Sequence, residues 1–349
     1  MKRRLKIIIL ILIAVIAILI LPLIITFLPK SVSEYAYREL TYLHLSNSLI
    51  TNDLSEQEKV ETMFKYVAIN IYAHEGFKTV DCNSFNDLIR GIGWCDQQAF
   101  VLNTLLNKQN IQSRLRDVQH HTCGEALLGD KWVLLDPYAG SIFYIKGTSE
   151  MASLDEIIRG EQLEYFPLKL EIPDLQVLYV PWEGRYREGI SPEYSDYAHK
   201  SVLKKAIEMD IRLGYALYGK KYAFWYQDKY LASIKELPDP GEKWIIDYKS
   251  IYKPSNDAYL EYFKGRNYYL YGRYPEALQT YNRVINAYPR TYWADESAWQ
   301  KGMVYFYNDR YVDSLSIFSN PQITANPLFK HRSKYMADLS KEAELAVLQ

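Results

Sequence analysis

Three residues are of the types that form a thiol catalytic site: Cys95, His121 and Asp136. In such a site a cysteine thiolate attacks a carbonyl carbon, a histidine moves the proton, and a carboxylate orients the imidazole. Cys95 follows Gly93 and Trp94 at the start of a predicted helix. Unpaired N–H groups and the helix dipole favour a thiolate there. These features predict Cys95 as a nucleophile.

The choice of histidine depends on the strands that carry it. His120 and His121 point to opposite faces if they lie on a strand. With the Gly-Asp pair at 129–130 as a two-residue turn, Asp136 lies opposite Cys123, diagonal to His121 and on the same face. His121 is therefore the predicted base and His120 a bystander. A loop of odd length would undo this assignment.

The elements around these residues predict an α+β domain. Ser55 and Glu58 have the spacing of a capping box, and apolar residues follow at helical spacing. A second, more buried helix is predicted over residues 95–108. Strands are predicted over residues 113–118, 121–128 and 131–137. This order of helices followed by a hairpin is typical of an α+β fold.

Three short runs in a fixed order carry a family resemblance. They are Gly93-Trp94-Cys95-Asp96-Gln97-Gln98-Ala99, then His121-x-x-x-Glu125, then Trp132-Val-Leu-Leu-Asp136-Pro137. Together they resemble the transglutaminase-like superfamily of cysteine enzymes, over roughly residues 50 to 140. The resemblance implies a papain-like α+β core with Cys95 as nucleophile, His121 as base and Asp136 as orienter. It implies no cofactor and no metal.

The chain departs from that family at Thr122-Cys123-Gly124, since family members often carry an aromatic residue two positions after the histidine. The sequence therefore does not determine the shape of the substrate channel. The backbone N–H of Cys95 is a candidate oxyanion donor, with Asn83 and Asn86 as weaker candidates.

Structural interpretations compete with the catalytic one. A lone buried cysteine usually packs as a small hydrophobe, and a lone histidine before a strand usually fills a packing position. Cys82 and Cys123 are an alternative disulfide pair in an oxidising compartment, although Cys123 is more simply a strand core residue. Three cysteines are too few for a disulfide scaffold, and none has zinc-site spacing.

The N-terminal segment predicts a membrane anchor. Residues 1–6 carry four cations, and residues 7–28 form an uncharged, largely apolar run. At about 1.5 Å per residue this run reaches roughly 33 Å, enough to cross a hydrocarbon core of about 30 Å. The charge bias predicts a cytoplasmic tail over residues 1–6 and a main body outside the cytoplasm. A cleaved signal peptide or a buried helix is the alternative.

A degenerate repeat occupies the C-terminal part. The first copy has Gly265, Tyr268, Gly272, Tyr274, Ala277, Tyr281 and Pro289; the second has Gly302, Tyr305, Asp309, Tyr311, Ser314 and Phe318. The period of 37 residues and these residue types resemble the tetratricopeptide repeat, which implies a groove for a protein partner. Helical hairpins that merely pack on the enzyme-like domain are the alternative.

These observations combine into one domain plan and one functional hypothesis. The transglutaminase-like domain spans residues 50–165, a linker and helical region spans 166–250, and the tetratricopeptide-like domain spans 255–349. The chain is expected to be a membrane-anchored thiol enzyme acting on amide bonds of a protein or peptide, by hydrolysis or by acyl transfer. The alternative is a non-catalytic envelope adaptor. The formal net charge of -1 argues against nucleic-acid binding.

Overall fold

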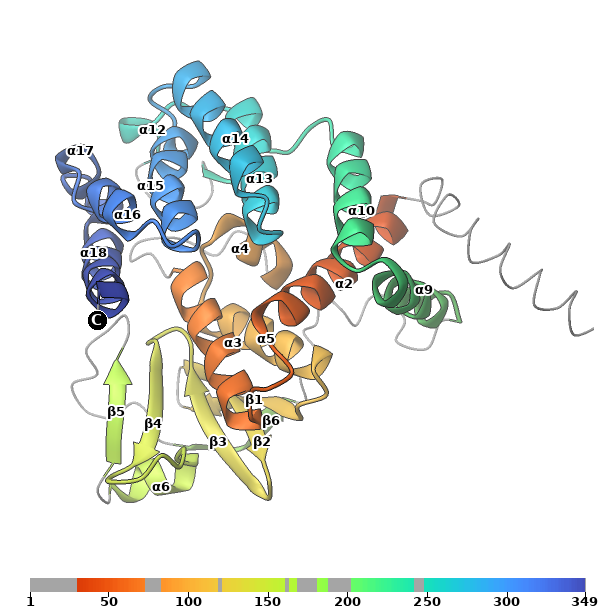
Figure 1. Cartoon of the computed structure of the whole chain (residues 1–349), viewed down its shortest axis with the longest axis vertical. Helices are drawn as coiled ribbons and strands as arrows, with labels where there is room; N and C mark the ends of the chain where they lie inside the picture. Colours follow the sequence, from red (N-terminus) through yellow and green to blue (C-terminus); the bar gives the residue numbers. More distant parts are fainter. Residues whose placement is uncertain are drawn as a thin grey trace, which may run out of the picture. The chain divides into compact units, whose positions relative to one another are not determined.

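The computed structural model describes residues 30–72, 83–118, 121–160, 163–167, 181–187, 202–241 and 248–348 (Figure 1). The chain divides into two compact units, Met1–His44 with Asp196–Ile234, and Leu45–Ser195 with Lys235–Gln349. The predicted tail and anchor, residues 1–6 and 7–28, lie outside the described residues. Within the described ranges, none of the helices combines the length and the apolar character needed to cross a membrane.

An antiparallel sheet forms the β part of the second unit, which confirms the predicted α+β class (Figure 1). Its six described strands lie in the order β5-β4-β3-β2-β1-β6. They are β1 (Ser113–Val118), β2 (His121–Leu128), β3 (Lys131–Asp136), β4 (Ser141–Ile145), β5 (Leu163–Pro167) and β6 (Pro181–Arg187). The first three are the predicted strands, whereas β6 comes from the segment predicted as linker.

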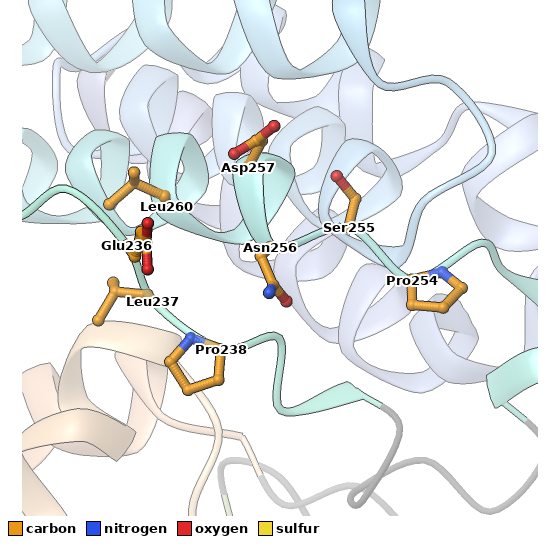
Figure 2. Close-up of a pocket in the computed structure, with 8 residues that line it drawn as sticks. All are labelled: Glu236, Leu237, Pro238, Pro254, Ser255, Asn256, Asp257 and Leu260. Carbon is orange, nitrogen blue, oxygen red and sulfur yellow. The ribbon is translucent and has the colours of Figure 1, made fainter.

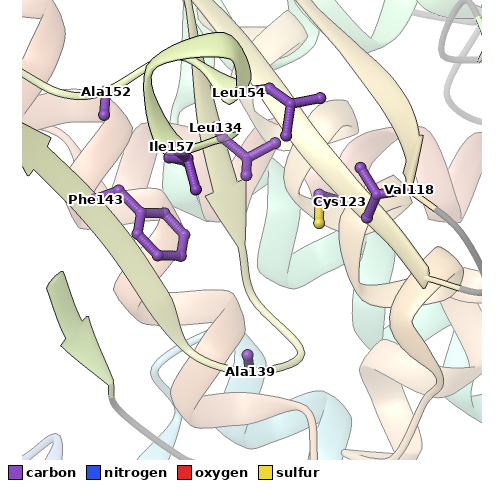
Figure 3. Close-up of a cluster of buried hydrophobic side chains, with 8 residues drawn as sticks. All are labelled: Val118, Cys123, Leu134, Ala139, Phe143, Ala152, Leu154 and Ile157. Atoms are coloured by element: carbon purple, nitrogen blue, oxygen red, sulfur yellow. The ribbon is translucent and has the colours of Figure 1, made fainter. Parts of the chain in front are cut away.

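The sheet is packed on both faces. The helices of this part are α3 (Glu56–Asn70), α4 (Ser84–Arg90), α5 (Cys95–Lys108) and α6 (Leu154–Arg159). On one face, Leu115 of β1 clusters with Ala99 and Phe100 of α5. On the other, α6 covers a cluster that contains Val118, Cys123, Leu134, Phe143, Leu154 and Ile157 (Figure 3). The capping box predicted at the start of α3 is confirmed, with both of its hydrogen bonds present.

A run of helices completes the second unit. They are α12 (Tyr248–Ile251), α13 (Asn256–Leu270), α14 (Tyr274–Ala287), α15 (Tyr292–Phe306), α16 (Tyr311–Phe318), α17 (Pro321–Thr324) and α18 (Pro327–Leu348). From α13 to α16 each helix packs on the next, and α18 packs on α16 (Figure 1).

The two predicted repeat copies make the same close helix contact. A Cβ atom built on Gly265 of α13 would lie 2.6 Å from a ring carbon of Tyr281 in α14. A Cβ atom built on Gly302 of α15 would lie 2.6 Å from ring carbons of Phe318 in α16. Each pair of helices therefore approaches closely because a glycine faces an aromatic ring.

The loops between the paired helices also match. Gly272 has a φ of +69°, and Asp309, at the equivalent position, has a φ of +56°. Aspartate tolerates the left-handed conformation better than most residues with a side chain. The substitution that weakens the second copy in sequence therefore keeps its backbone conformation.

In the described residues of the first unit the helices are α2 (Lys30–Leu49), which belongs to this unit as far as His44, α9 (Val202–Tyr218) and α10 (Lys220–Ser233). Tyr37 of α2 stacks on Tyr230 of α10 with ring centroids 3.8 Å apart. The Nδ1 atom of His44 lies 3.1 Å from the hydroxyl of Tyr215 in α9. Aromatic packing and a polar contact thus join helices from distant parts of the sequence.

Candidate active site

The β2–β3 hairpin brings His121 and Asp136 together. Leu128 pairs with Lys131, which confirms the two-residue turn at 129–130, and Gly124 pairs with Leu135. One further step of this register puts Asp136 opposite Cys123, as the spacing predicted. The Nε2 atom of His121 lies 2.7 Å from Oδ2 of Asp136.

The Asp136 carboxylate is fixed through both oxygens. Its side chain is fully buried, and Oδ1 accepts a hydrogen bond from the backbone N–H of Ala139 at 3.0 Å. The His121 side chain keeps 10% of its surface exposed. A buried carboxylate with a hydrogen bond to each oxygen, next to a slightly exposed imidazole, has the geometry of an orienting group and its base.

The charge of Asp136 favours the protonated imidazole. Burial by itself lowers the pKa of His121, but Cys123 and Asp136 raise it, and the net pKa lies well above its usual range. Burial raises the pKa of the Cys123 thiol to about 12, so this thiol is neutral near pH 7. Asp136 is therefore the negative group that holds the proton on His121 at neutral pH.

Cys95 is the first residue of α5 and is half-buried. The N–H of Trp94 donates to Oε1 of Gln97 at 2.8 Å, and Nε2 of Gln98 donates to the carbonyl of Gly93 at 2.8 Å. These bonds hold the turn that starts the helix, where its dipole favours an anion. Cys95 thus occupies the predicted helix start, next to partners that fix the backbone around it.

Two of the three predicted residues, His121 and Asp136, meet at one end of the sheet. His121 is the first residue of β2 and Asp136 is the last of β3, and these positions coincide in an antiparallel pair. After burial, Asp136 and His121, the charge of Cys95 is a further influence on the pKa of Cys123. Cys95 therefore lies within electrostatic range of the strand that carries His121.

Cys123 is part of this site, which the sequence analysis missed. Its thiol lies next to the His121 ring, since ligand atoms of His121, Cys123 and Asp136 all lie within 4.8 Å of one another. The signal was available, because Cys123 is two residues after His121 on one strand and opposite Asp136. Cys123 carries a free thiol, and Cys82, its alternative disulfide partner, lies outside the described residues.

Two other motif residues, Glu125 and Trp132, both contact Arg114 of β1. The Nε atom of Arg114 in β1 contacts Oε2 of Glu125 at 2.5 Å, and its guanidinium lies 4.0 Å from the ring centroid of Trp132. Glu125 is nearly fully buried, so Arg114 compensates its charge. The residues that carried the family resemblance therefore stabilise the hairpin as well as the site. Arg114 was not singled out from the sequence.

The weaker oxyanion candidates come from α4. Asn83 caps this helix by accepting a hydrogen bond from the N–H of Asn86 at 3.1 Å. This gives the Asn83 side chain a structural role. The N–H of Cys95 is at the first position of α5, where N–H groups have no acceptor within the helix, and its role as an oxyanion donor stays a prediction.

The segment between α4 and Cys95 is held by a strand-like bridge. Gly91 ends α4 with a φ of +79°. The N–H of Tyr72 donates to the carbonyl of Gly91 at 2.8 Å, and the N–H of Gly93 donates back to the carbonyl of Tyr72 at 3.0 Å. Residues immediately before the predicted nucleophile are thus fixed by backbone hydrogen bonds.

The C-terminal helices hold the end of α4 as well. The fully buried Arg266 of α13 donates through Nε to the carbonyl of Ile89 at 2.7 Å and through Nη2 to that of Leu88 at 2.9 Å. The hydroxyl of Tyr262 donates to the carbonyl of Arg90 at 2.7 Å. Side chains of the repeat region therefore satisfy the last carbonyls of the helix that leads to Cys95.

A surface pocket of about 770 Å³ lies elsewhere in the second unit (Figure 2). It is lined by residues 236–238, by residues 254–257 and by Leu260 of α13. Glu236 and Asp257 supply carboxylates to it. Asn256 accepts a hydrogen bond from the N–H of Asp239 at 2.7 Å, which ties the two segments together. None of the three predicted site residues lines this pocket.

His120 lies outside the described residues, so its predicted role as a bystander stays a prediction. The catalytic roles of Cys95, His121 and Asp136 also stay predictions, although His121 and Asp136 are hydrogen-bonded as expected. In comparisons with known proteins, no family model and no curated protein matches the chain.

Proposed function

We propose that the protein is a thiol enzyme that acts on amide bonds, with Cys95 as nucleophile, His121 as base and Asp136 as orienter. The 2.7 Å contact between His121 and Asp136 carries the proposal, because the mechanism needs a carboxylate that orients the imidazole. A buried carboxylate bonded to a slightly exposed imidazole near a helix-start cysteine matches the chemistry of acyl transfer. A transglutaminase-like core is the fold we infer for this part.

The proposed reaction starts from a thiolate–imidazolium pair. The Cys95 sulfur attacks the amide carbonyl carbon and forms a C–S bond. The proton on His121 then passes to the leaving amine as the C–N bond breaks, which leaves a thioester. Water or a second amine attacks the thioester carbonyl, gives its proton to His121, and releases Cys95. Attack by water makes the protein a peptidase or amidase; attack by an amine makes it a transglutaminase.

The remaining parts of the proposal concern location and recognition. We infer an extracytoplasmic enzyme anchored through residues 7–28, with a tetratricopeptide-like region that binds a protein partner or substrate. The paired glycine–aromatic contacts of α13–α14 and α15–α16 support a repeated helical hairpin. The apolar run of residues 7–28, with cations before it, supports the anchor.

The proposal is tested by the reactivity of Cys95 in the full-length protein. Alkylation with iodoacetamide is followed against pH, and mass mapping identifies the modified cysteine. We expect fast modification of Cys95 with an apparent pKa below the value of about 8.5 of a free thiol. His121→Ala should slow the reaction near neutral pH and move the apparent pKa upward, because the imidazolium no longer stabilises the thiolate.

Asp136→Asn gives a matched comparison, because it keeps the size of the side chain and removes its charge. We expect an intermediate loss of reactivity, since the imidazole stays in place and its proton is held less tightly. If Cys95 instead titrates like a free thiol and neither variant alters its rate, the enzyme proposal is wrong and the adaptor alternative stands.

Hydrolysis and acyl transfer are separated by their products. A casein substrate incubated with a fluorescent primary amine becomes labelled only if an amine attacks the thioester. New peptide termini or released ammonia without label indicate attack by water. The Cys95→Ala protein is the control for both products.

A further inference from the structure

The proposed mechanism assigns no step to the Cys123 thiol, although this thiol lies inside the site. It is fully buried, lies within 4.8 Å of ligand atoms of His121 and Asp136, and shares a strand face with both residues. Figure 3 shows Cys123 beside Val118, within the apolar cluster to which Leu154 and Ile157 of α6 also belong.

The three side chains offer a nitrogen, a sulfur and an oxygen to one point. Their ligand atoms all lie within 4.8 Å of one another. Atoms bound about 2.0–2.3 Å from one zinc ion lie roughly 3.3–3.8 Å apart in a tetrahedral site. Side-chain shifts of about 1 Å, with opening of the His121–Asp136 contact, give those separations.

The charges of the set also suit a divalent cation. A deprotonated Cys123 and the Asp136 carboxylate each carry one negative charge, and a neutral His121 carries none. A doubly charged ion neutralises this sum, which matters because an uncompensated charge is costly in a buried site. A thiolate and an imidazole favour a thiophilic ion such as Zn²⁺ over Mg²⁺ or Ca²⁺, which prefer oxygen ligands.

We propose that His121, Cys123 and Asp136 form an inhibitory site for a thiophilic divalent cation, with Zn²⁺ as its type. The ion takes the imidazole nitrogen, the thiolate sulfur and a carboxylate oxygen, and water completes the tetrahedron. The thiol proton and the proton on His121 pass to solvent. While the ion is bound, His121 is a neutral imidazole with one nitrogen on the ion, so it has no acid proton to give to the leaving amine and the enzyme is switched off reversibly. This inhibitory consequence rests on the proposed function; the cation site itself does not.

The test measures metal binding by the full-length protein, without reference to activity. Zn²⁺ is titrated in competition with a chromophoric chelator, and Co²⁺ is added separately as a spectroscopic probe. We expect one equivalent of Zn²⁺ per chain and, with Co²⁺, a sulfur-to-cobalt charge-transfer absorption. Cys123→Ser should raise the Kd for Zn²⁺ by at least about 100-fold, the upper end of what loss of an outer-shell partner costs. It should also abolish that absorption.

Cys95→Ala is the matched control, because it removes the other thiol at the site and keeps the three proposed ligands. It should change the Kd by less than about tenfold and keep the cobalt absorption. Cys123→Ala is a second variant with the same expected loss, and circular dichroism checks that both Cys123 variants are folded.

The proposal is overturned if the protein binds no Zn²⁺, or if Cys123→Ser binds it as tightly as the unaltered protein. It is also overturned if Cys95→Ala abolishes the cobalt absorption, since the ion would then sit on Cys95. If the protein binds no Zn²⁺ but Cys95 has a lowered pKa, the cation site is wrong and the proposed function stands. If the protein binds Zn²⁺ but Cys95 titrates like a free thiol, the proposed function is wrong and the cation site stands.

Discussion

His121 has partners on several sides, and its protonation therefore depends on all of them. Asp136 contacts Nε2 at 2.7 Å, the Cys123 thiol lies within 4.8 Å of a ring nitrogen, and the ring of Tyr138 lies 5.7 Å away between centroids. Of these groups, Asp136 carries the charge that matters near neutral pH. The imidazole is thus held as an imidazolium in the folded protein.

Because His121 is protonated in the folded protein, we expect it to make the free energy of unfolding depend on pH. His121→Gln should remove this contribution. The pKa of His121 is raised in the folded state, whereas that of an unfolded histidine is about 6.5. Its contribution is complete below about pH 6.5 and is lost as the pH rises toward the folded-state pKa. Between about pH 6.5 and 8, the unfolding free energy should fall by up to about 1.4 kcal/mol per pH unit from this group.

Denaturant unfolding at several pH values checks this slope. The unaltered protein and His121→Gln should differ in slope over that window, with the steeper fall in the unaltered protein. Because the other histidines are common to both proteins, the difference isolates His121. Equal slopes would show that the folded site does not hold the proton.

At the scale of elements, the repeated hairpins depend on glycines that face aromatic rings. Gly265 meets Tyr281, and Gly302 meets Phe318, with the same separation along the chain. A glycine inside a helix usually costs stability, because it loses more backbone entropy than alanine. Its presence at both sites is explained by the close approach of the partner ring.

Gly302→Ala and Gly265→Ala should therefore destabilise the protein. The new methyl group would lie 2.6 Å from a ring carbon, too close without movement of the ring. We expect a loss of about 1–3 kcal/mol, the cost of overpacking, instead of the gain of about 0.4–1 kcal/mol at an open helical site. Thermal and denaturant unfolding measure the change.

A double-mutant cycle shows whether the ring is the cause. In a Phe318→Leu background, Gly302→Ala should cost less than it does alone, because the smaller side chain leaves room for the methyl group. Costs that are equal in both backgrounds would assign the loss to the helix backbone.

The loop positions 272 and 309 predict opposite effects for matched substitutions. Both have left-handed φ angles, and both side-chain positions are exposed. Asp309→Gly should raise the unfolding free energy by up to about 1 kcal/mol, since glycine adopts this conformation without strain. Gly272→Ala should lower it by about 1–2 kcal/mol. Urea unfolding compares them, and two changes of the same sign would contradict the shared conformation.

At the scale of the second unit, a buried polar chain joins the C-terminal helices to the site. Arg266 bonds to the carbonyls of α4 and, through Nη1, to Oε1 of Gln300 at 2.9 Å. Gln300 donates to Glu296 at 2.9 Å, and Glu296 forms a buried ion pair with Arg332 of α18. Three helices thus share one network that ends at the segment before Cys95.

Arg266→Met should destabilise the second unit strongly and lower the reactivity of Cys95. The change leaves the carbonyls of Leu88 and Ile89 buried without their donor, and each unsatisfied group costs about 1–3 kcal/mol. We expect a total loss of roughly 3–5 kcal/mol by chemical unfolding. At a temperature where the variant is still folded, alkylation of Cys95 should be slower, because the backbone before it is less fixed.

Arg310→Met is the control for this change. Arg310 forms a half-exposed ion pair with Asp313, and its loss should cost under about 1 kcal/mol. It should leave the alkylation rate of Cys95 unaltered. Similar losses from both arginine variants would contradict a special role for the Arg266 network.

The sequence by itself determined the local elements and the register that pairs His121 with Asp136. Capping residues, apolar spacing and a two-residue turn act over a few positions, so α3, α5 and β1–β3 were predictable, and so was the hairpin parity. The same local rules marked both repeat copies through their glycines and aromatic rings. The identities of Cys95, His121 and Asp136 as candidates followed from this local information.

Only the tertiary structure decided what the buried side chains do. The tyrosines of the repeats suggested helix packing, but not that Tyr262 and Tyr269 reach Arg90 and Asn70 in another part of the chain. Likewise, the strand pattern predicts Cys123 as a core residue, whereas the folded chain brings its thiol next to His121 and Asp136. Such partners lie far apart in sequence or depend on which atoms a buried side chain reaches. Local periodicity contains no information about them.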